Sequence, residues 1–245
     1  ILNLSTNCKR LTFHTPDLFD LENNDVGGYV KLKFTNKNEI NTRPFLLRPF
    51  TIRAFRKKVL EIDIDFVIHN KGIASNWVKS VKIGDKINIS GLGKRPKINL
   101  ESDWFFFAGD LSALPAILVN LEIINKNSQG IIIIEILSPK DRILINKPKN
   151  FSIYWVLNTE PYKKNSLLLD KIKKTIWLQG SPFIWVACEF SNMKKIRDFF
   201  FSKYKIYKEQ IYISSYWKVG SDQEQHKDFK KADNSNWVEK SQNHN

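Results

Sequence analysis

The sequence predicts an antiparallel β-barrel followed by a doubly wound α/β domain, because its hydrophobic pattern changes near residue 98. Before that point, apolar and polar residues alternate in short stretches, which is typical of antiparallel strands with one buried face. After it, the apolar runs are continuous, which is typical of parallel strands covered on both faces. We therefore expect a Greek-key barrel over residues 1–98, the α/β domain over 99–220, and a polar helix or tail over 221–245.

Two stretches of the first part show the clearest alternation. Residues 30–34 alternate apolar side chains with lysines, and residues 60–66 alternate them with acidic side chains. We expect the polar side chains of both stretches to face water. The residues 91–93, Gly-Leu-Gly, are expected to end a later strand, and one helix is expected over 74–80.

The second part supplies the strands and helices of the α/β domain. Short apolar runs predict parallel strands at 104–108, 131–137, 152–157, 183–188 and 211–214. Apolar residues at helical spacing predict helices over 114–124 and 193–200.

The composition excludes several classes of protein. The 39 basic and 25 acidic residues give a net charge of +14, which attracts anions, but the lysines are spread along the whole chain. We therefore expect no nucleic-acid partner. No apolar run approaches the ~18 residues of a membrane span, and the first residues do not read as a signal peptide. Cys and His lack metal-ligand spacing. We expect a cytoplasmic monomer with no membrane partner and no bound metal.

The segment Arg48-Pro49-Phe50-Thr51-Ile52-Arg53 joins two cations, a ring and a hydroxyl. On a strand, Arg48 and Phe50 share one face while Thr51 and Arg53 point the other way. This arrangement suits a flat ring system with a diphosphate tail, because Arg pairs with phosphate and an aromatic side chain stacks on a ring. Taken alone, the segment is more typical of an edge strand with exposed arginines.

Two other segments are suited to phosphate. Gly72, Ala74 and Ser75 lie at the expected start of a helix, where backbone N–H groups and a hydroxyl can meet an anion, although plain N-capping by Ser75 is the alternative. Residues 108–115 pass from an apolar strand to a helix, which is where doubly wound sheets bind nucleotides. There Gly109 permits close approach and Ser112 can donate a hydrogen bond.

The segment 138–142 bears on the choice of dinucleotide. Lys140 and Arg142 can pair with a 2′-phosphate, whereas an acidic residue favours a free 2′-hydroxyl. Because Asp141 lies between them, NADPH is favoured only slightly over NADH.

Taken together, six segments in this order resemble the siderophore-interacting proteins, flavin-dependent ferric-siderophore reductases of the ferredoxin reductase superfamily. The first is Arg48-Pro49-Phe50-Thr51, which resembles an Arg-x-Tyr-Thr/Ser flavin motif with Phe in place of Tyr. The segments lie at residues 48–53, 65–69, 72–77, 108–117, 185–189 and 214–217.

The resemblance implies a role for each segment. Arg48 would contact the FAD diphosphate, Phe50 would pack on the isoalloxazine ring, and Thr51 would lie near flavin N5, so Phe50 and Thr51 are the expected catalytic residues. The resemblance and the patterns above together give the expected cofactor-binding residues, which are Arg48, Phe50, Thr51, Arg53, His69, Gly72, Ala74, Ser75, Gly109, Asp110, Ser112, Ala113, Lys140, Arg142, Glu189, Tyr216 and Trp217.

The expected function is therefore an FAD-dependent NAD(P)H ferric-siderophore reductase that releases Fe(II). Lys218, Lys227 and Lys230 are candidates for attracting an anionic ferric siderophore, although lysines at such positions are more often simply exposed. Two alternatives remain open. A flavin-dependent oxidoreductase with another acceptor would share every segment, and a basic barrel that binds nucleic acid would need no flavin.

Overall fold

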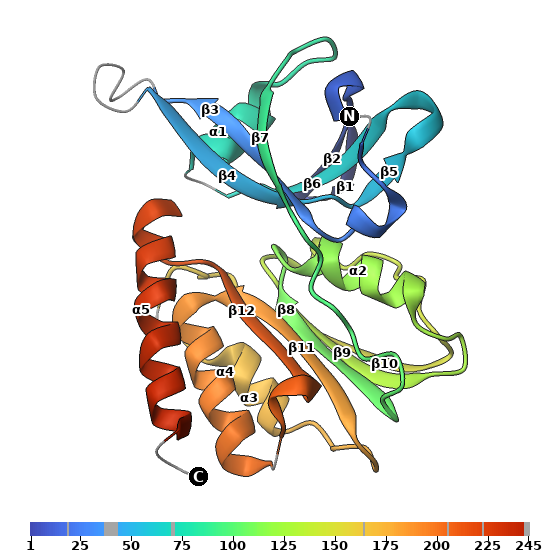
Figure 1. Cartoon of the computed structure of the whole chain (residues 1–245), viewed down its shortest axis with the longest axis vertical. Helices are drawn as coiled ribbons and strands as arrows, with labels where there is room; N and C mark the ends of the chain where they lie inside the picture. Colours follow the sequence, from blue (N-terminus) through green and yellow to red (C-terminus); the bar gives the residue numbers. More distant parts are fainter. Residues whose placement is uncertain are drawn as a thin grey trace.

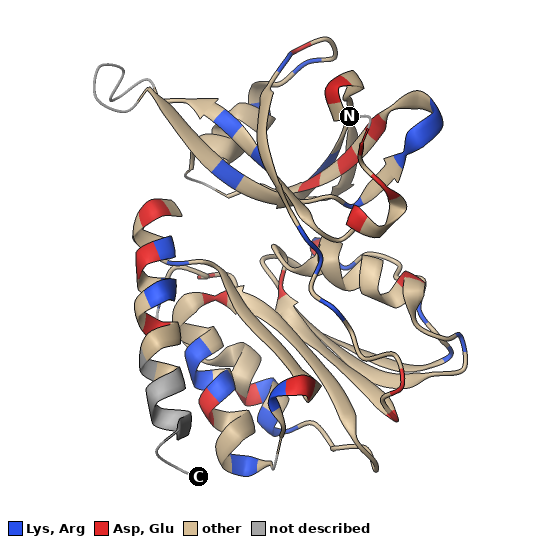
Figure 2. Ribbon diagram, in the orientation of Figure 1, with Lys and Arg blue, Asp and Glu red and all other residues tan. Residues whose placement is uncertain are grey.

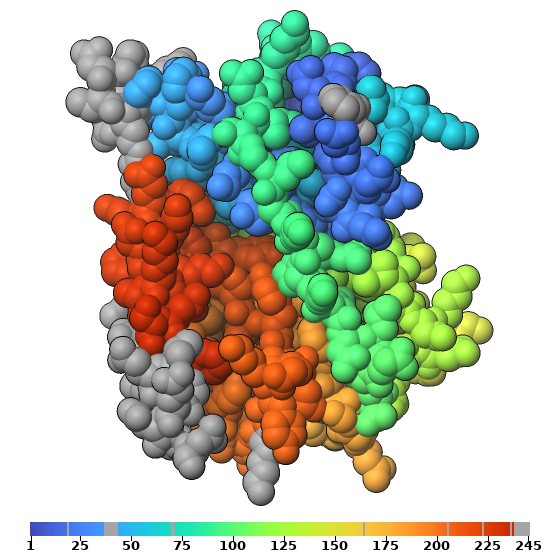
Figure 3. Space-filling view, viewed as in Figure 1, coloured from blue at the N-terminus to red at the C-terminus, as the bar shows by residue number. Residues whose placement is uncertain are grey.

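A computed structural model describes residues 1–18, 20–36, 44–69, 72–163, 165–204, 206–221 and 223–242, and the side chains of the final helix over 223–235 and at 237. A β-barrel and an α/β domain are stacked along the long axis (Figure 1). Residues 94–103, which link the barrel to the α/β domain, cross the junction on the front of the molecule (Figure 3).

The barrel consists of two antiparallel sheets in the orders β1-β2-β6-β5 and β4-β3-β7. Its elements are β1 (Leu2–Ser5), β2 (Cys8–His14), η1 (Pro16–Leu18), η2 (Asn23–Asp25), β3 (Tyr29–Thr35), β4 (Phe45–Thr51), β5 (Ala54–Arg56), η3 (Lys57–Val59), β6 (Glu61–Val67), α1 (Ile73–Ser80) and β7 (Asn88–Gly93). Residues 91–93 are the last three of β7, so the prediction that they end this strand is confirmed.

Alternation predicted the apolar face of the barrel correctly. Val30, Leu32 and Phe34 of β3 are buried against Ile62 and Ile64 of β6. The wet face predicted for β6 was wrong, because Asp63 and Asp65 are only 7% and 6% exposed.

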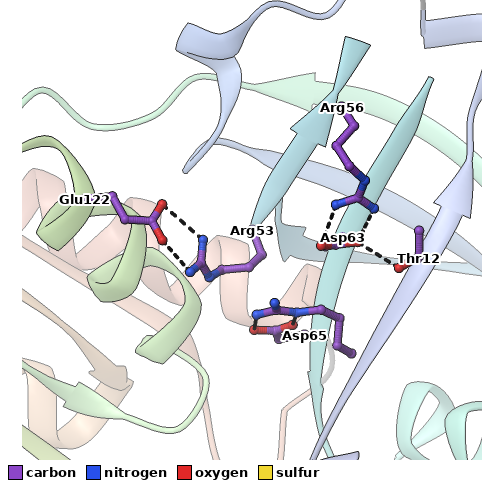
Figure 4. Close-up of polar contacts among 7 residues, drawn as sticks. Thr12, Arg53, Arg56, Asp63, Asp65 and Glu122 are labelled. Atoms are coloured by element: carbon purple, nitrogen blue, oxygen red, sulfur yellow. Dashed lines mark hydrogen bonds and ion pairs between the residues drawn. The ribbon is translucent and has the colours of Figure 1, made fainter. Parts of the chain in front are cut away.

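The two buried carboxylates of β6, Asp63 and Asp65, are covered by partners from neighbouring strands. Asp65 receives two hydrogen bonds from Arg10, at 2.6 and 2.9 Å, and Asp63 receives bonds from Arg56 and Thr12 (Figure 4). β6 lies between β2 and β5, so these side chains extend over it, and a buried charge is tolerated when it is paired in this way.

The α/β domain has a sheet of five parallel strands, within the described ranges, in the order β10-β9-β8-β11-β12. Its elements are β8 (Trp104–Asp110), α2 (Leu114–Ile123), β9 (Gln129–Ile136), η4 (Pro139–Asp141), β10 (Asn150–Leu157), α3 (Leu167–Lys173), β11 (Pro182–Glu189), α4 (Phe190–Lys203), η5 (Lys208–Gln210), β12 (Ile211–Trp217) and α5 (Gln223–Gln242).

Helices cover both faces of this sheet, as a doubly wound fold requires. Helix α2 packs on the face that carries Phe105 and Phe107, while α3 and α4 pack on the face that carries Trp104 and Phe106. The short helix α3 was not predicted. The strand β10 is only partly buried because it lies at the edge of the sheet, so its apolar run did not indicate a strand covered on both faces.

The C-terminal helix α5 packs against α4 and β12 through polar contacts. Arg197 of α4 donates to both oxygens of Asp233, at 2.6 and 3.0 Å, and Lys230 donates to Ser214. Ser215 and the Nε2 atom of His226 lie 2.8 Å apart. In the ranges that the structure describes, no helix is both long enough and apolar enough to span a membrane.

We expect Asp233→Asn to destabilise the fold by about 3 kcal/mol, because it leaves the buried Arg197 guanidinium without its counter-charge. Urea-induced unfolding measures the loss. Asp228→Asn on the exposed side of the same helix is the matched control, and an equal effect of both variants would contradict the prediction.

Candidate functional site

The site lies where the carboxyl ends of the parallel strands face the barrel. Three rings meet there: those of His69 after β6, Tyr162 after β10 and Trp217 at the end of β12. The ring centroids are 6.0 to 6.1 Å apart. Beside them is a cavity of about 370 Å³, lined by Asn7, Ile68, His69, Leu137, Thr159, Glu160, Pro161, Tyr162 and Lys163. Both domains therefore contribute walls to one cavity.

Asp110, at the end of β8, holds the strand ends together. Its Oδ2 atom accepts hydrogen bonds from the Trp217 indole at 2.8 Å and from the backbone N–H of Glu189 at 3.0 Å, and its Oδ1 atom accepts from the backbone and hydroxyl of Ser112. Burial raises the pKa of Asp110, and these donors oppose that rise. The Ser112 donors that we predicted to face a phosphate therefore bond to Asp110 in this structure.

Glu189 links the end of β11 to the two segments that follow it. Its Oε2 atom accepts from the backbone N–H groups of Ser191 and Asn192 and so caps α4, while its Oε1 atom accepts from Val219 N after β12. Tyr216 is partly buried against the core of the domain, with its ring 6.2 Å from that of Trp185, and burial raises its pKa. Tyr216 thus packs within the domain, whereas Trp217 faces the site.

Glu135 of β9 is a third buried carboxylate at these strand ends, opposite Asp110 in the sheet register. Its Oε1 atom accepts from Asn158 Nδ2 at 2.9 Å, and its buried Oε2 atom has no hydrogen-bond partner in the described part of the chain. Burial, with the charges of Asp110 and Glu189, raises the pKa of Glu135 to about 7 against the opposing bond from Asn158. Asn158 also accepts from Glu160 N, so this pair shapes the start of the cavity-lining loop.

On the barrel side, β4 faces the α/β domain (Figure 1). The register places Arg48 opposite Leu32 and Phe50 opposite Val30, and therefore on the core-facing side of the strand. The Phe50 ring lies 4.4 Å from Phe66, and Arg48 donates to the carbonyl of Leu47.

The other two residues of this segment lie on the opposite side of the chain. Thr51 pairs in register with Tyr29 and is half-buried. Arg53 reaches the α/β domain, where its guanidinium makes two hydrogen bonds to Glu122 of α2, at 2.5 and 3.2 Å (Figure 4). The contact of Arg53 with a phosphate stays a prediction.

The start of α1 is open, but Ser75 is not its exposed donor. Gly72 has φ of +125°, and a Cβ atom placed on it would meet nothing within 4 Å. Ser75 accepts from His69 N at 3.0 Å and donates to the Val67 carbonyl, so it neither caps the helix nor faces outward. Ala74 packs towards the barrel core. Burial, and then the nearby Lys79, lower the pKa of His69.

Gly109 has a packing reason for lacking a side chain. A Cβ atom there would lie 2.4 Å from the carbonyl oxygen of Ala187 and 2.6 Å from the Cβ atom of Ala113. Glycine is therefore needed for β8 to pack against β11 and the following turn. An additional role beside a diphosphate stays a prediction.

The structure separates the charges of residues 140–142. Asp141 is 1% exposed and accepts hydrogen bonds from Ser5, from the backbone and side chain of Asn7, and from Ser138 N. Lys140 and Arg142 are exposed on either side of it. The carboxylate that weakened the preference for NADPH is therefore occupied in joining β1 and β2 to η4.

The three lysines proposed for substrate have unlike surroundings. Lys230 bonds to Ser214 and Ser215, and Lys218 lies 4.7 Å from the Phe229 ring and 5.5 Å from the Phe190 ring, so both help to hold α5 in place. Lys227 is exposed. Basic residues are spread over both domains (Figure 2), which does not favour one substrate-attracting patch.

Sequence reasoning missed several residues at this junction. Tyr162 and Asn158 follow an edge strand without a recognisable motif, and Glu122 looks like an ordinary polar residue of an amphipathic helix. A signal was present at Glu135, because an acidic residue interrupts the isoleucine run of residues 131–136.

Comparison with known proteins identifies two matching regions. Residues 37–95 match the siderophore-interacting FAD-binding domain, and residues 102–220 match the siderophore-interacting protein family. Ferric vibriobactin reductase ViuB of Vibrio cholerae is 28% identical over 238 residues, covering 90% of this chain and 88% of that protein. NADPH-dependent ferric-chelate reductase of Escherichia coli is 25% identical over 163 residues, covering 64% of this chain and 61% of that protein.

A solved structure has the same fold. The siderophore-interacting protein SipS of Aeromonas hydrophila superposes with a TM-score of 0.81 at 24% identity, covering 94% of this chain and 93% of that one. The predicted barrel followed by an α/β domain is thereby confirmed.

Glu135 generates a prediction about pH. A carboxyl with a folded pKa of about 7 and an unfolded value near 4.5 stabilises the fold fully below 4.5, and this contribution is lost as pH rises through about 7. We expect wild-type stability to fall between pH 5 and 8 by on the order of 2 kcal/mol, and Glu135→Gln to remove most of that fall.

Chemical denaturation at several pH values measures this slope. Glu160→Gln, an exposed carboxylate on the adjacent loop, is the control and should keep the wild-type slope. A Glu135→Gln slope equal to that of wild type would contradict the prediction.

Proposed function

Because the chain belongs to the siderophore-interacting protein family, we propose that it is an FAD-dependent ferric-siderophore reductase that uses NAD(P)H. The observation that carries the proposal is the meeting of His69, Tyr162 and Trp217 beside one cavity between the barrel and the strand ends. A reductase of this kind must bring two nucleotide cofactors together at such a junction.

The barrel residues fit FAD. The open start of α1 at Gly72 offers backbone N–H groups that have no acceptor within the helix, which suits a diphosphate. The Nδ1 atom of His69 is buried and has no hydrogen-bond partner among the described residues, so it can bond to a ligand. Arg48 and Phe50 supply a cation and a ring face on the neighbouring strand.

Bound FAD would supply the redox chemistry, accepting a hydride from NAD(P)H and passing single electrons to Fe(III). The chain's own part is to bind and orient. We propose that Phe50 packs on the flavin ring and that Thr51 lies near its reacting edge. Trp217, fixed by Asp110, would exclude water from the α/β side.

The α/β domain would hold the nicotinamide dinucleotide at its strand ends. Exposed Lys140 and Arg142 support NADPH over NADH, since Asp141, which lies between them in the sequence, is buried and bonded elsewhere. The NADPH-dependent relative in Escherichia coli supports the same choice. Dependence on a dinucleotide that cells keep in the cytoplasm also supports a cytoplasmic location.

We propose a ferric siderophore as the acceptor, by analogy with the relative that acts on ferric vibriobactin. Reduction would release iron because Fe(II) binds hard oxygen ligands less tightly than Fe(III). The net charge of +14 favours an anionic chelate. A reductase with another acceptor remains the second candidate, since the same residues around the cavity would serve it.

The purified chain should be yellow, should bleach with NADPH under argon, and should regain its colour when a ferric chelate is added. An absorption spectrum follows each step. Absence of flavin after incubation with FAD would refute the proposed cofactor, and bleaching without reoxidation by ferric chelates would refute the substrate class alone.

The double variant Lys140→Ala, Arg142→Ala should raise the KM for NADPH roughly tenfold, because charge-assisted bonds to a phosphate are lost. The KM for NADH should change little. Steady-state kinetics with both dinucleotides measure the difference, and Lys149→Ala is the control, because this exposed lysine precedes β10 at the opposite end of the parallel strands. Equal losses with NADH and NADPH would contradict a 2′-phosphate contact.

A further inference from the structure

Arg53 and Glu122 form an ion pair that joins the barrel to the α/β domain (Figure 4). Arg53 follows β4, and Glu122 lies in the last turn of α2. Two guanidinium nitrogens donate to the two carboxylate oxygens, and the arginine side chain is 14% exposed. A bidentate pair of this type fixes direction as well as distance.

The position of Glu122 is unusual for a helix. A carboxylate in the last turn is unfavourable because the partial charge there is already negative, and α2, all of whose residues are described, has no basic residue in that turn. The Arg53 guanidinium supplies the missing positive charge from the other domain.

The pair also lies away from the strand-end site. Glu122 is eight residues beyond Leu114, where α2 begins, which is about 12 Å along the helix at ~1.5 Å per residue. The backbone around Arg53 is held firmly, since Ile52 N donates to the Gly28 carbonyl and Arg53 N to the Asp63 carbonyl. Nearby, a Cβ atom on Gly27 would lie 2.9 Å from Val119 of α2, so the two domains touch closely here.

From this geometry we propose that Arg53 is a positioning residue, not a phosphate ligand. Arg53 holds α2 in place through Glu122. It thereby fixes the strand ends with Asp110 at a set distance from Thr51, which lies two residues before Arg53. The inference rests on the proposed function, in which Thr51 and the strand ends hold the two reacting rings. A small change in their separation would slow hydride transfer without weakening FAD binding.

The test compares Arg53→Met, Glu122→Gln and the double variant with wild type. Each should lower the rate constant of flavin reduction by NADPH roughly tenfold, and the double variant should be no slower than the singles. The Kd for FAD, from flavin fluorescence, should stay within about twofold. The exchanged pair Arg53→Glu with Glu122→Arg should recover much of the rate.

A second readout needs no flavin. In the cofactor-free chain, hydrogen–deuterium exchange of residues 50–56 and 114–123 should rise together by about fivefold in either single variant. Glu22→Gln is the matched control, because it removes the Lys57–Glu22 pair, which lies within the barrel and does not join the domains.

Two results would overturn the proposal. The first is weakening of FAD binding by about tenfold in Arg53→Met together with normal flavin reduction in Glu122→Gln, since Arg53 would then be a cofactor ligand. The second is unchanged exchange of both segments. If the wild-type chain bound no flavin, the proposed function would fail, but the exchange measurement would still decide whether the pair couples the domains.

Discussion

The carboxylate of Asp110 is the constraint on which the candidate site depends. It lies inside the protein, where an unpaired charge would cost several kcal/mol, so its surroundings must supply donors. Those donors come from the turn before α2, from the end of β11 and from the last residue of β12. By satisfying one charge, the chain fixes the ends of three neighbouring strands and orients Trp217. The charge of Asp110 is also one cause of the raised pKa of Glu135, because a second negative charge close to Asp110 is unfavourable.

The junction between the domains is held by polar contacts at two places. Asp141 bonds to Ser5 and Asn7 beside η4, and Arg53 bonds to Glu122 at the end of α2. Because these contacts fix the position of one domain relative to the other, a cavity lined by residues of both domains can keep a constant shape. This explains why residues as far apart in sequence as His69 and Trp217 can serve one site.

Local pattern was sufficient for much of the fold, whereas the roles of the expected site residues stay predictions. The alternation in residues 30–34 and the continuous run in 104–108 were correctly interpreted because burial alone determines them. The hydrogen-bond partners of individual side chains could not be predicted from the sequence. Asp63 and Asp65 fitted a wet face until Arg56 and Arg10 were seen to cover them, and the hydroxyl of Ser75 bonds within the barrel. Such contacts are set by side chains that meet only in the folded chain, so periodicity does not reveal them.

The hydrogen bonds from Asn7 to Asp141 have a consequence for biosynthesis. The two residues are 134 positions apart, so the first hairpin lacks this partner until the barrel and two strands of the next domain have been translated. At ~5–20 residues per second, that interval is on the order of ten seconds. These strands thus leave the ribosome well before the residue that completes their final contacts.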